Sequence, residues 1–109
     1  MFVNKIEISI YSSSVNFTNL YIDLEEENII LNQKRIKLSF DDLFVIVDKI
    51  IKITNKWDDI EMINLLEYQK VTVSIQIPPI QKEYMFLDNV PVNLSEIYSI
   101  ILELEEKYE

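Results

Sequence analysis

Two segments of this chain alternate apolar and polar residues without a break, and this period of two constrains the fold more than any other feature. In "KIEISIY" the apolar positions are Ile6, Ile8 and Ile10, and in "KVTVSIQI" they recur from Val71 to Ile77. Successive side chains of a β-strand point to opposite faces of the sheet. The alternation therefore predicts two strands that each bury one face.

Other stretches extend this sheet. "FTNLYIDLEEEN" predicts a strand with Leu20, Ile22 and Leu24 on one face, followed by a turn. Because the chain contains no Gly, Asn must serve where φ is positive, and Asn28 is the expected left-handed residue of this turn. "IILN" and "RIKLS" continue as strands around a turn at 32–34, and "EYMFL" returns as the antiparallel partner of "KVTVSIQI" after two prolines.

A first amphipathic helix is predicted to begin after Ser39 and to end near Asn55. Ser39 and Asp42 have the spacing of a capping box, and Asp41 adds negative charge at the positive end of the helix dipole. Its expected apolar stripe is Phe40, Leu43, Phe44, Val47, Ile50 and Ile51, widened by Ile46 and Ile53. A short helix is predicted within 58–66.

A second amphipathic helix follows a cap at Asn93 or Ser95 and ends near Tyr108. Its stripe is Leu94, Ile97, Tyr98, Ile101 and Leu104. Similar phrases, "LNQKRIKLS" and "LDNVPVNLS", precede the two helices. A duplication and a convergence on one strand-to-helix connection both fit this similarity, and convergence is favoured because the helix stripes fall out of register.

These elements predict an α+β fold within a single domain of residues 1–109. We expect a mostly antiparallel sheet of about five strands with two amphipathic helices packed on one face, in the order β-ββ-α-ββ-α. The face away from the helices would carry Lys5, Glu7, Tyr21, Thr72, Ser74 and Gln76. The expected core is Ile6, Ile8, Ile10, Leu43, Phe44, Val47, Ile50, Val73, Ile75, Ile97, Ile101 and Leu104.

The absence of Cys, His and Gly removes whole classes of chemistry. Without Cys and His the chain has no thiolate nucleophile, no zinc–thiolate site and no imidazole base. Without Gly it has neither a phosphate-cradling loop nor a nucleophile elbow. Asp58 and Asp59 lack the spacing of a calcium-binding loop. We therefore expect no enzymatic activity, no cofactor and no bound metal.

The net charge of −9 disfavours two kinds of partner. Direct contact with nucleic acid or with an anionic membrane needs clustered Lys and Arg. The N-terminal residues lack the pattern of a signal peptide, and charged residues interrupt the apolar run from Phe40 to Ile53. A cytoplasmic location is expected. The acidity either keeps a small protein in solution or forms a face that docks on a basic partner.

Two acidic clusters are the candidate binding residues. The first contains Asp23, Glu25, Glu26 and Glu27, and the second contains Asp58, Asp59 and Glu61. Trp57, Tyr21 and Tyr68 are the predicted apolar anchors beside them, because interface hot spots are rich in Trp and Tyr. The alternatives are that the first cluster is a solvated hairpin turn and that Trp57 packs on the end of the first helix.

The amino-acid composition indicates something about origin. Gly and Ala, whose codons are rich in G and C, are absent, and there is one Arg against nineteen Ile. This bias indicates an A/T-rich genome. Together with small size and acidity, it favours a non-catalytic protein-binding module, encoded by a phage or plasmid, that inhibits a nuclease or other nucleic-acid-handling enzyme. The inhibitor would be of the anti-defence or nucleic-acid-mimic type. The alternatives are an immunity or antitoxin-like partner of a basic toxin, and a structural or assembly subunit that forms a homodimer.

Overall fold

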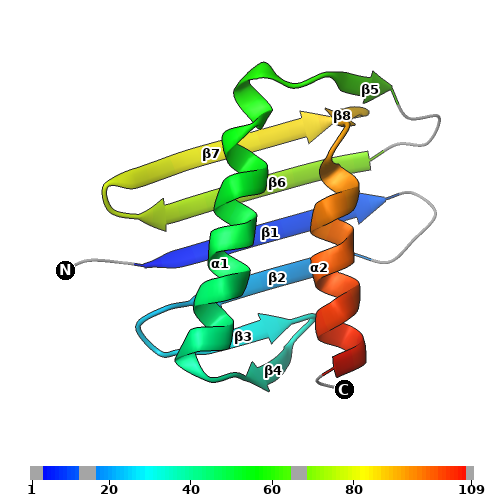
Figure 1. Cartoon of the computed structure of the whole chain (residues 1–109). Helices are drawn as coiled ribbons and strands as arrows, with labels where there is room; N and C mark the ends of the chain where they lie inside the picture. The colour runs from blue at the N-terminus through cyan, green and yellow to red at the C-terminus, as the bar shows by residue number, and fades with distance from the viewer. Residues whose placement is uncertain (1–3, 13–16, 65–68, 108–109) are drawn as a thin grey trace.

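The computed structural model describes residues 4–12, 17–64 and 69–107, and it shows an α+β fold. A six-stranded antiparallel sheet in the order β4-β3-β2-β1-β6-β7 carries both helices on one face (Figure 1). The fold class is as predicted, although the sheet has six strands where about five were expected. A second, two-stranded sheet pairs β5 with β8.

The main sheet is built from successive hairpins. Its strands are β1 (Lys5–Ser12), β2 (Thr18–Asp23), β3 (Asn28–Leu31), β4 (Lys34–Lys37), β6 (Gln69–Ile77) and β7 (Ile80–Leu87). β1 is central and pairs with both β2 and β6, so that Ile8 lies opposite Leu20 on one side and Val73 on the other. This register places the alternating apolar residues of the central strands on one face.

Helices α1 (Phe40–Asn55) and α2 (Leu94–Lys107) cover that apolar face. They run antiparallel to one another and cross the strands steeply (Figure 1). Ser39 caps α1, because its Oγ accepts a hydrogen bond from the Asp42 backbone N–H at 3.2 Å. Within the described part of the chain, neither helix has the length and apolarity to cross a bilayer.

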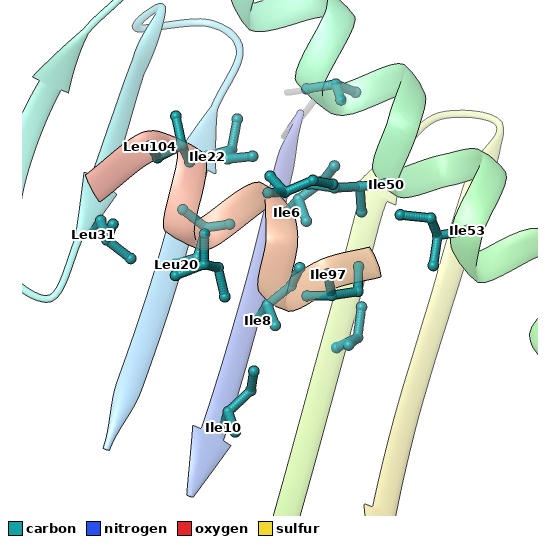
Figure 2. Close-up of a cluster of buried hydrophobic side chains, with 14 of the residues drawn as sticks. Ile6, Ile8, Ile10, Leu20, Ile22, Leu31, Ile50, Ile53, Ile97 and Leu104 are labelled. Atoms are coloured by element: carbon teal, nitrogen blue, oxygen red, sulfur yellow. The ribbon is translucent and has the colours of Figure 1, made fainter. Parts of the chain in front are cut away.

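The core lies between the sheet and the two helices. Figure 2 shows the isoleucines of β1 and Leu20 and Ile22 of β2 in this layer, with side chains from both helices among them. Of the twelve residues predicted to be buried, eleven are buried: Ile6, Ile8, Ile10, Leu43, Val47, Ile50, Val73, Ile75, Ile97, Ile101 and Leu104. The remaining one, Phe44, was predicted wrongly.

Phe44 is 56% exposed because α1 is rotated relative to the predicted stripe. The buried side of the helix follows Leu43, Val47, Ile50 and Thr54, at spacings of four, three and four residues. Phe40 and Phe44 therefore lie on the flank of α1, where their rings contact each other with centroids 6.1 Å apart. Thr54 can take a core position because its hydroxyl donates to the Ile51 carbonyl at 3.1 Å.

The turns of this Gly-free chain use other residues at positive φ, namely Glu27, Asn32, Gln33 and Asp88. In the β2–β3 turn the left-handed residue is Glu27, with φ of 53°, while Asn28 already belongs to β3. The prediction for Asn28 was therefore wrong by one position. Asn32 and Gln33 both have positive φ in the β3–β4 turn, the pattern of a type I′ hairpin.

The connector after α1 also differs from the prediction. Over 58–64, the described part of the range 58–66 in which a short helix was expected, the chain instead forms a 3-10 turn, η1 (Trp57–Asp59), followed by β5 (Met62–Asn64). β5 pairs with β8 (Asn89–Pro91), which leads into α2. Since α2 begins at Leu94, Asn93 holds the cap position and Ser95 lies inside the helix. Ser39 and Ser95 are therefore not structurally equivalent.

Candidate partner-binding site

The first acidic cluster forms the β2–β3 turn. The Asp23 carboxylate accepts hydrogen bonds from the backbone N–H groups of Glu25 at 2.9 Å and Glu26 at 3.1 Å, so Asp23 builds the turn itself. Glu25, Glu26 and Glu27 are exposed. The ion pairs among the described residues join Lys52 to Asp48 and Lys82 to Asp58, so these three glutamates stand outside them. The turn presents three uncompensated carboxylates.

Tyr21 lies on the open face of the sheet, two residues before Asp23. It pairs with Glu7 of β1 on one side and with Ile30 of β3 on the other. Partial burial raises the pKa of the Tyr21 phenol, and the nearby charges of Asp23 and Glu7 raise it further. The phenol is half-buried, so it offers a neutral aromatic surface beside the acidic turn.

The second acidic cluster follows the end of α1. Asp58 and Asp59 are exposed in η1, and Glu61 is exposed just after it. A Lys82 ammonium approaches Asp58 at 4.0 Å, the limit of an ion pair, and the pair is open to solvent. Screening by water leaves such a contact with little energetic value. This cluster is therefore mostly uncompensated as well.

Trp57, predicted as an anchor, is a core residue with 5% of its surface exposed. Its ring makes edge contacts with Tyr84 and Phe86 of β7, at centroid distances of 5.1 and 5.2 Å. Its Nε1–H donates to the Asn93 side-chain oxygen at 2.7 Å. A buried indole has almost no surface for a partner to contact, so the alternative of packing at the end of α1 describes it better.

Asn93 is a residue whose role the sequence did not indicate beyond a possible cap. Besides accepting from Trp57, its Nδ2 donates to the Ile53 carbonyl in the last turn of α1 at 3.3 Å. The one side chain thereby joins α1, η1 and the start of α2. Tyr68, the third predicted anchor, lies outside the described residues.

The structure does not bring the two acidic clusters together. The first lies on the side of the sheet where α1 begins, and the second follows the C-terminal end of α1 (Figure 1). A helix of 16 residues is about 24 Å long. A partner must therefore span roughly this length to touch both clusters, or bind at one of them.

The open face of the sheet carries much less of the negative charge. Strand alternation places four basic and three acidic side chains on it: Lys5, Arg35, Lys37 and Lys70 with Glu7, Asp23 and Glu83. In a chain with a net charge of −9, the excess carboxylates are therefore gathered elsewhere. The β2–β3 turn and the η1 segment are two of these places.

The helical side contains a groove of about 400 Å³ between α1 and α2. One side, called here the basic wall, consists of Lys49 and Lys52 of α1 and of Lys56 directly after it. The other side, called the acidic wall, consists of Glu96, Ser99 and Glu103 of α2. Ile53 and Ile100 line the space between them. This groove was not predicted from the sequence, although the three lysines recur at spacings of three and four residues, as on one side of a helix.

No group of acidic side chains among the described residues is arranged to hold a metal ion. No protein-family model, curated protein or solved structure matches this chain. The function is therefore inferred from the surfaces of the molecule itself.

Proposed function

We propose that this protein is a non-catalytic binding module that docks its exposed carboxylates on a basic protein partner in the cytoplasm. The partner class that fits best is a nuclease or other nucleic-acid-handling enzyme, whose phosphate-binding surface carries Lys and Arg. Binding there would inhibit the enzyme by occupying the place of nucleic acid. The A/T-rich coding bias supports an origin in a phage or plasmid.

The observation that carries this proposal is the uneven placement of charge. Six exposed carboxylates lie at two segments near opposite ends of α1: Glu25, Glu26, Glu27, Asp58, Asp59 and Glu61. None of these side chains is needed by the core, and neighbouring like charges repel one another. Solubility alone would be served as well by the same charge spread over the open face.

Tyr21 is the apolar contact expected beside the first cluster. Electrostatic attraction sets mainly the association rate and the choice of partner, whereas a partly desolvated aromatic contact slows dissociation. Trp57 is left out of this surface because it is buried. Its contribution is to hold η1, and with it Asp58 and Asp59, against the body of the protein.

The test begins with capture of a partner from a bacterial lysate at low salt, followed by its purification and kinetic binding measurements. One variant carries Glu25→Lys and Glu26→Lys, and another carries Asp58→Lys and Asp59→Lys. At least one of them should associate with the partner at least tenfold more slowly than the parent. Double-stranded DNA should compete with the parent for the same partner.

A matched control separates a local effect from a change in total charge. Glu105→Lys with Glu106→Lys alters the net charge equally but changes exposed residues in the last turns of α2. The control should bind like the parent. If both cluster variants also bind like the parent, acidic docking is excluded and the charge serves only solubility.

A further inference from the structure

The basic and acidic walls of the inter-helix groove face each other without neutralising each other. Lys52 forms an ion pair at 3.0 Å with Asp48 of its own helix, and the other ion pair of the described residues, between Lys82 and Asp58, lies outside the groove. No ion pair in this described region therefore crosses from α1 to α2. Two complementary rows of charge are left available to something outside the molecule.

The antiparallel course of the helices sets the order of charges along the groove. Lys49 lies at the level of Ile100 and Glu103, because these three residues line both the groove and a smaller pocket that adjoins it. The chain directions then place Lys52 and Lys56 toward the N-terminal end of α2, where Glu96 lies (Figure 1). The glutamates therefore lie opposite the two outer lysines, Lys49 and Lys56, and Ser99 lies between them on the other wall.

We propose that the helical layer is the contact surface of a homodimer, formed by two copies whose twofold axis runs parallel to α1 and α2 along the groove. Rotation by 180° about this axis lays α1 of one copy over α2 of the other at the same height along the helices. The basic wall of each copy then meets the acidic wall of the other. Because a twofold contact is self-complementary, this match occurs twice.

The charge of the whole chain restricts self-association to faces where charge is locally balanced, and the groove is one of them. Two copies with a net charge of −9 repel each other over most of their surface. The groove and the smaller pocket that adjoins it are lined by three basic and three acidic side chains: Lys49, Lys52, Lys56, Asp42, Glu96 and Glu103. Approach along this locally neutral lining avoids the repulsion that the acidic turn and the η1 segment would produce.

Apolar contact is available at one end of the same layer. Val45 is 52% exposed and lies four residues before Lys49, so it continues the line of the basic wall. It lines the smaller pocket next to the groove together with Ile46, Ile100 and Leu104. The two helices are about 24 Å long or shorter, so the area that they can bury is near the lower limit of specific interfaces. The dimer is therefore weak and sensitive to salt.

The test uses sedimentation equilibrium of the full chain at low salt over about 10 to 500 µM, a range suited to a weak complex. The expected mass rises from one chain to two, and about 1 M salt, where the Debye length is about 3 Å, weakens the dimer at least tenfold. A parent that stays monomeric over the whole range overturns the proposal.

Two charge-reversal variants identify the surface. Lys49→Glu with Lys52→Glu makes both walls predominantly acidic, and Glu96→Lys with Glu103→Lys makes both walls basic. Each variant alone should dimerise at least tenfold more weakly than the parent, because like walls now meet. An equimolar mixture of the two should dimerise again, because each wall then meets its opposite.

The mixture separates a loss of charge complementarity from a loss of folding, because association should return although both variants keep their substitutions. All four altered side chains are exposed, and circular dichroism checks that both variants are folded. Dimers that survive in both variants, or a mixture that stays monomeric, exclude this surface and point to another one, such as the edge strands β4 or β7. The acidic clusters are unchanged in these variants, so this result is independent of partner binding.

Discussion

The Trp57 indole N–H donates a hydrogen bond to the Asn93 side-chain oxygen at 2.7 Å, joining the segment after α1 to the start of α2. The two residues are 36 positions apart in the chain. The same Asn93 amide donates to the Ile53 carbonyl in the last turn of α1, which also accepts from the Lys56 backbone N–H. One side chain therefore connects both helices and positions the second acidic cluster.

Asn93→Ala should lower the free energy of unfolding by about 1–3 kcal/mol, because it leaves the buried indole N–H without its acceptor. Asn93→Asp keeps an acceptor for Trp57 but loses the donor to Ile53, so its loss should be smaller. Urea unfolding followed by circular dichroism measures both. Equal midpoints for the parent and Asn93→Ala would show that the bond contributes nothing.

A double-mutant cycle isolates the pair. Trp57→Phe removes the N–H while retaining an aromatic ring against Tyr84 and Phe86. Combined with Asn93→Ala, it should reveal a coupling free energy of about 1 kcal/mol. Additive losses would mean that Asn93 stabilises the protein through Ile53 alone.

Truncation of neighbouring residues tests the rotation of α1. Leu43→Ala should cost about 2–5 kcal/mol because Leu43 is fully buried. Phe44→Ala should cost less than about 1 kcal/mol, because the residue is more than half exposed and its ring lies against Phe40, which is also exposed. The two variants serve as controls for each other in one thermal or urea series. A larger loss for Phe44→Ala would restore the stripe first expected from the sequence.

The contrast between sheet and helix explains how far the sequence was informative. In β1 and β6 the period of two leaves a single way to bury the isoleucines and valines, so the faces were predictable. In α1 the apolar residues cover a wide arc that includes Phe40, Phe44 and Ile51 as well as the buried row. Such a helix can be rotated about its axis without bringing a charged side chain into the core. Only tertiary packing selects which side of the helix faces the sheet.

Long-range partners account for the remaining differences. β5 and β8 are strands of three residues, and Met62 pairs with Pro91 across a large separation in the chain. Neither segment carries a local signal strong enough to predict a strand. Trp57 is likewise held by residues distant in the chain, namely Tyr84, Phe86 and Asn93. The two clusters of carboxylates could be predicted from the sequence. Their placement near opposite ends of α1 could be known only from the fold.

Replacement of Gln33 by Gly should stabilise the protein by about 0.5–1 kcal/mol. Gln33 has φ of 70°, a conformation that costs a residue with a Cβ about 1–2 kcal/mol and costs Gly nothing sterically. The greater flexibility of Gly in the unfolded chain offsets part of this gain. Gln33→Ala is the control and should give no stabilisation. A midpoint for Gln33→Gly below that of Gln33→Ala would contradict the turn geometry.

Tyr21 should make the protein less stable at alkaline pH. Partial burial and the charges of Asp23 and Glu7 hold the pKa of its phenol above the ordinary value of about 10. The folded state then keeps the proton where the unfolded state has released it, so stability falls as pH rises from about 10 toward the raised pKa. Tyr21→Phe should lessen this fall, and Glu7→Gln should lower the pKa of Tyr21. Absorbance titration near 295 nm of the parent and the two variants measures the ionisation of the phenol directly, and urea midpoints over the same pH range measure stability.

Tyr98 contributes a separate transition that the Tyr21 and Glu7 variants leave in place. The pKa of Tyr98 is also raised, mainly by burial, and its hydroxyl accepts a hydrogen bond from Gln69. If Tyr21→Phe follows the same alkaline decline as the parent, the phenol does not carry the effect, and the open face beside the acidic turn is more solvated than its geometry indicates.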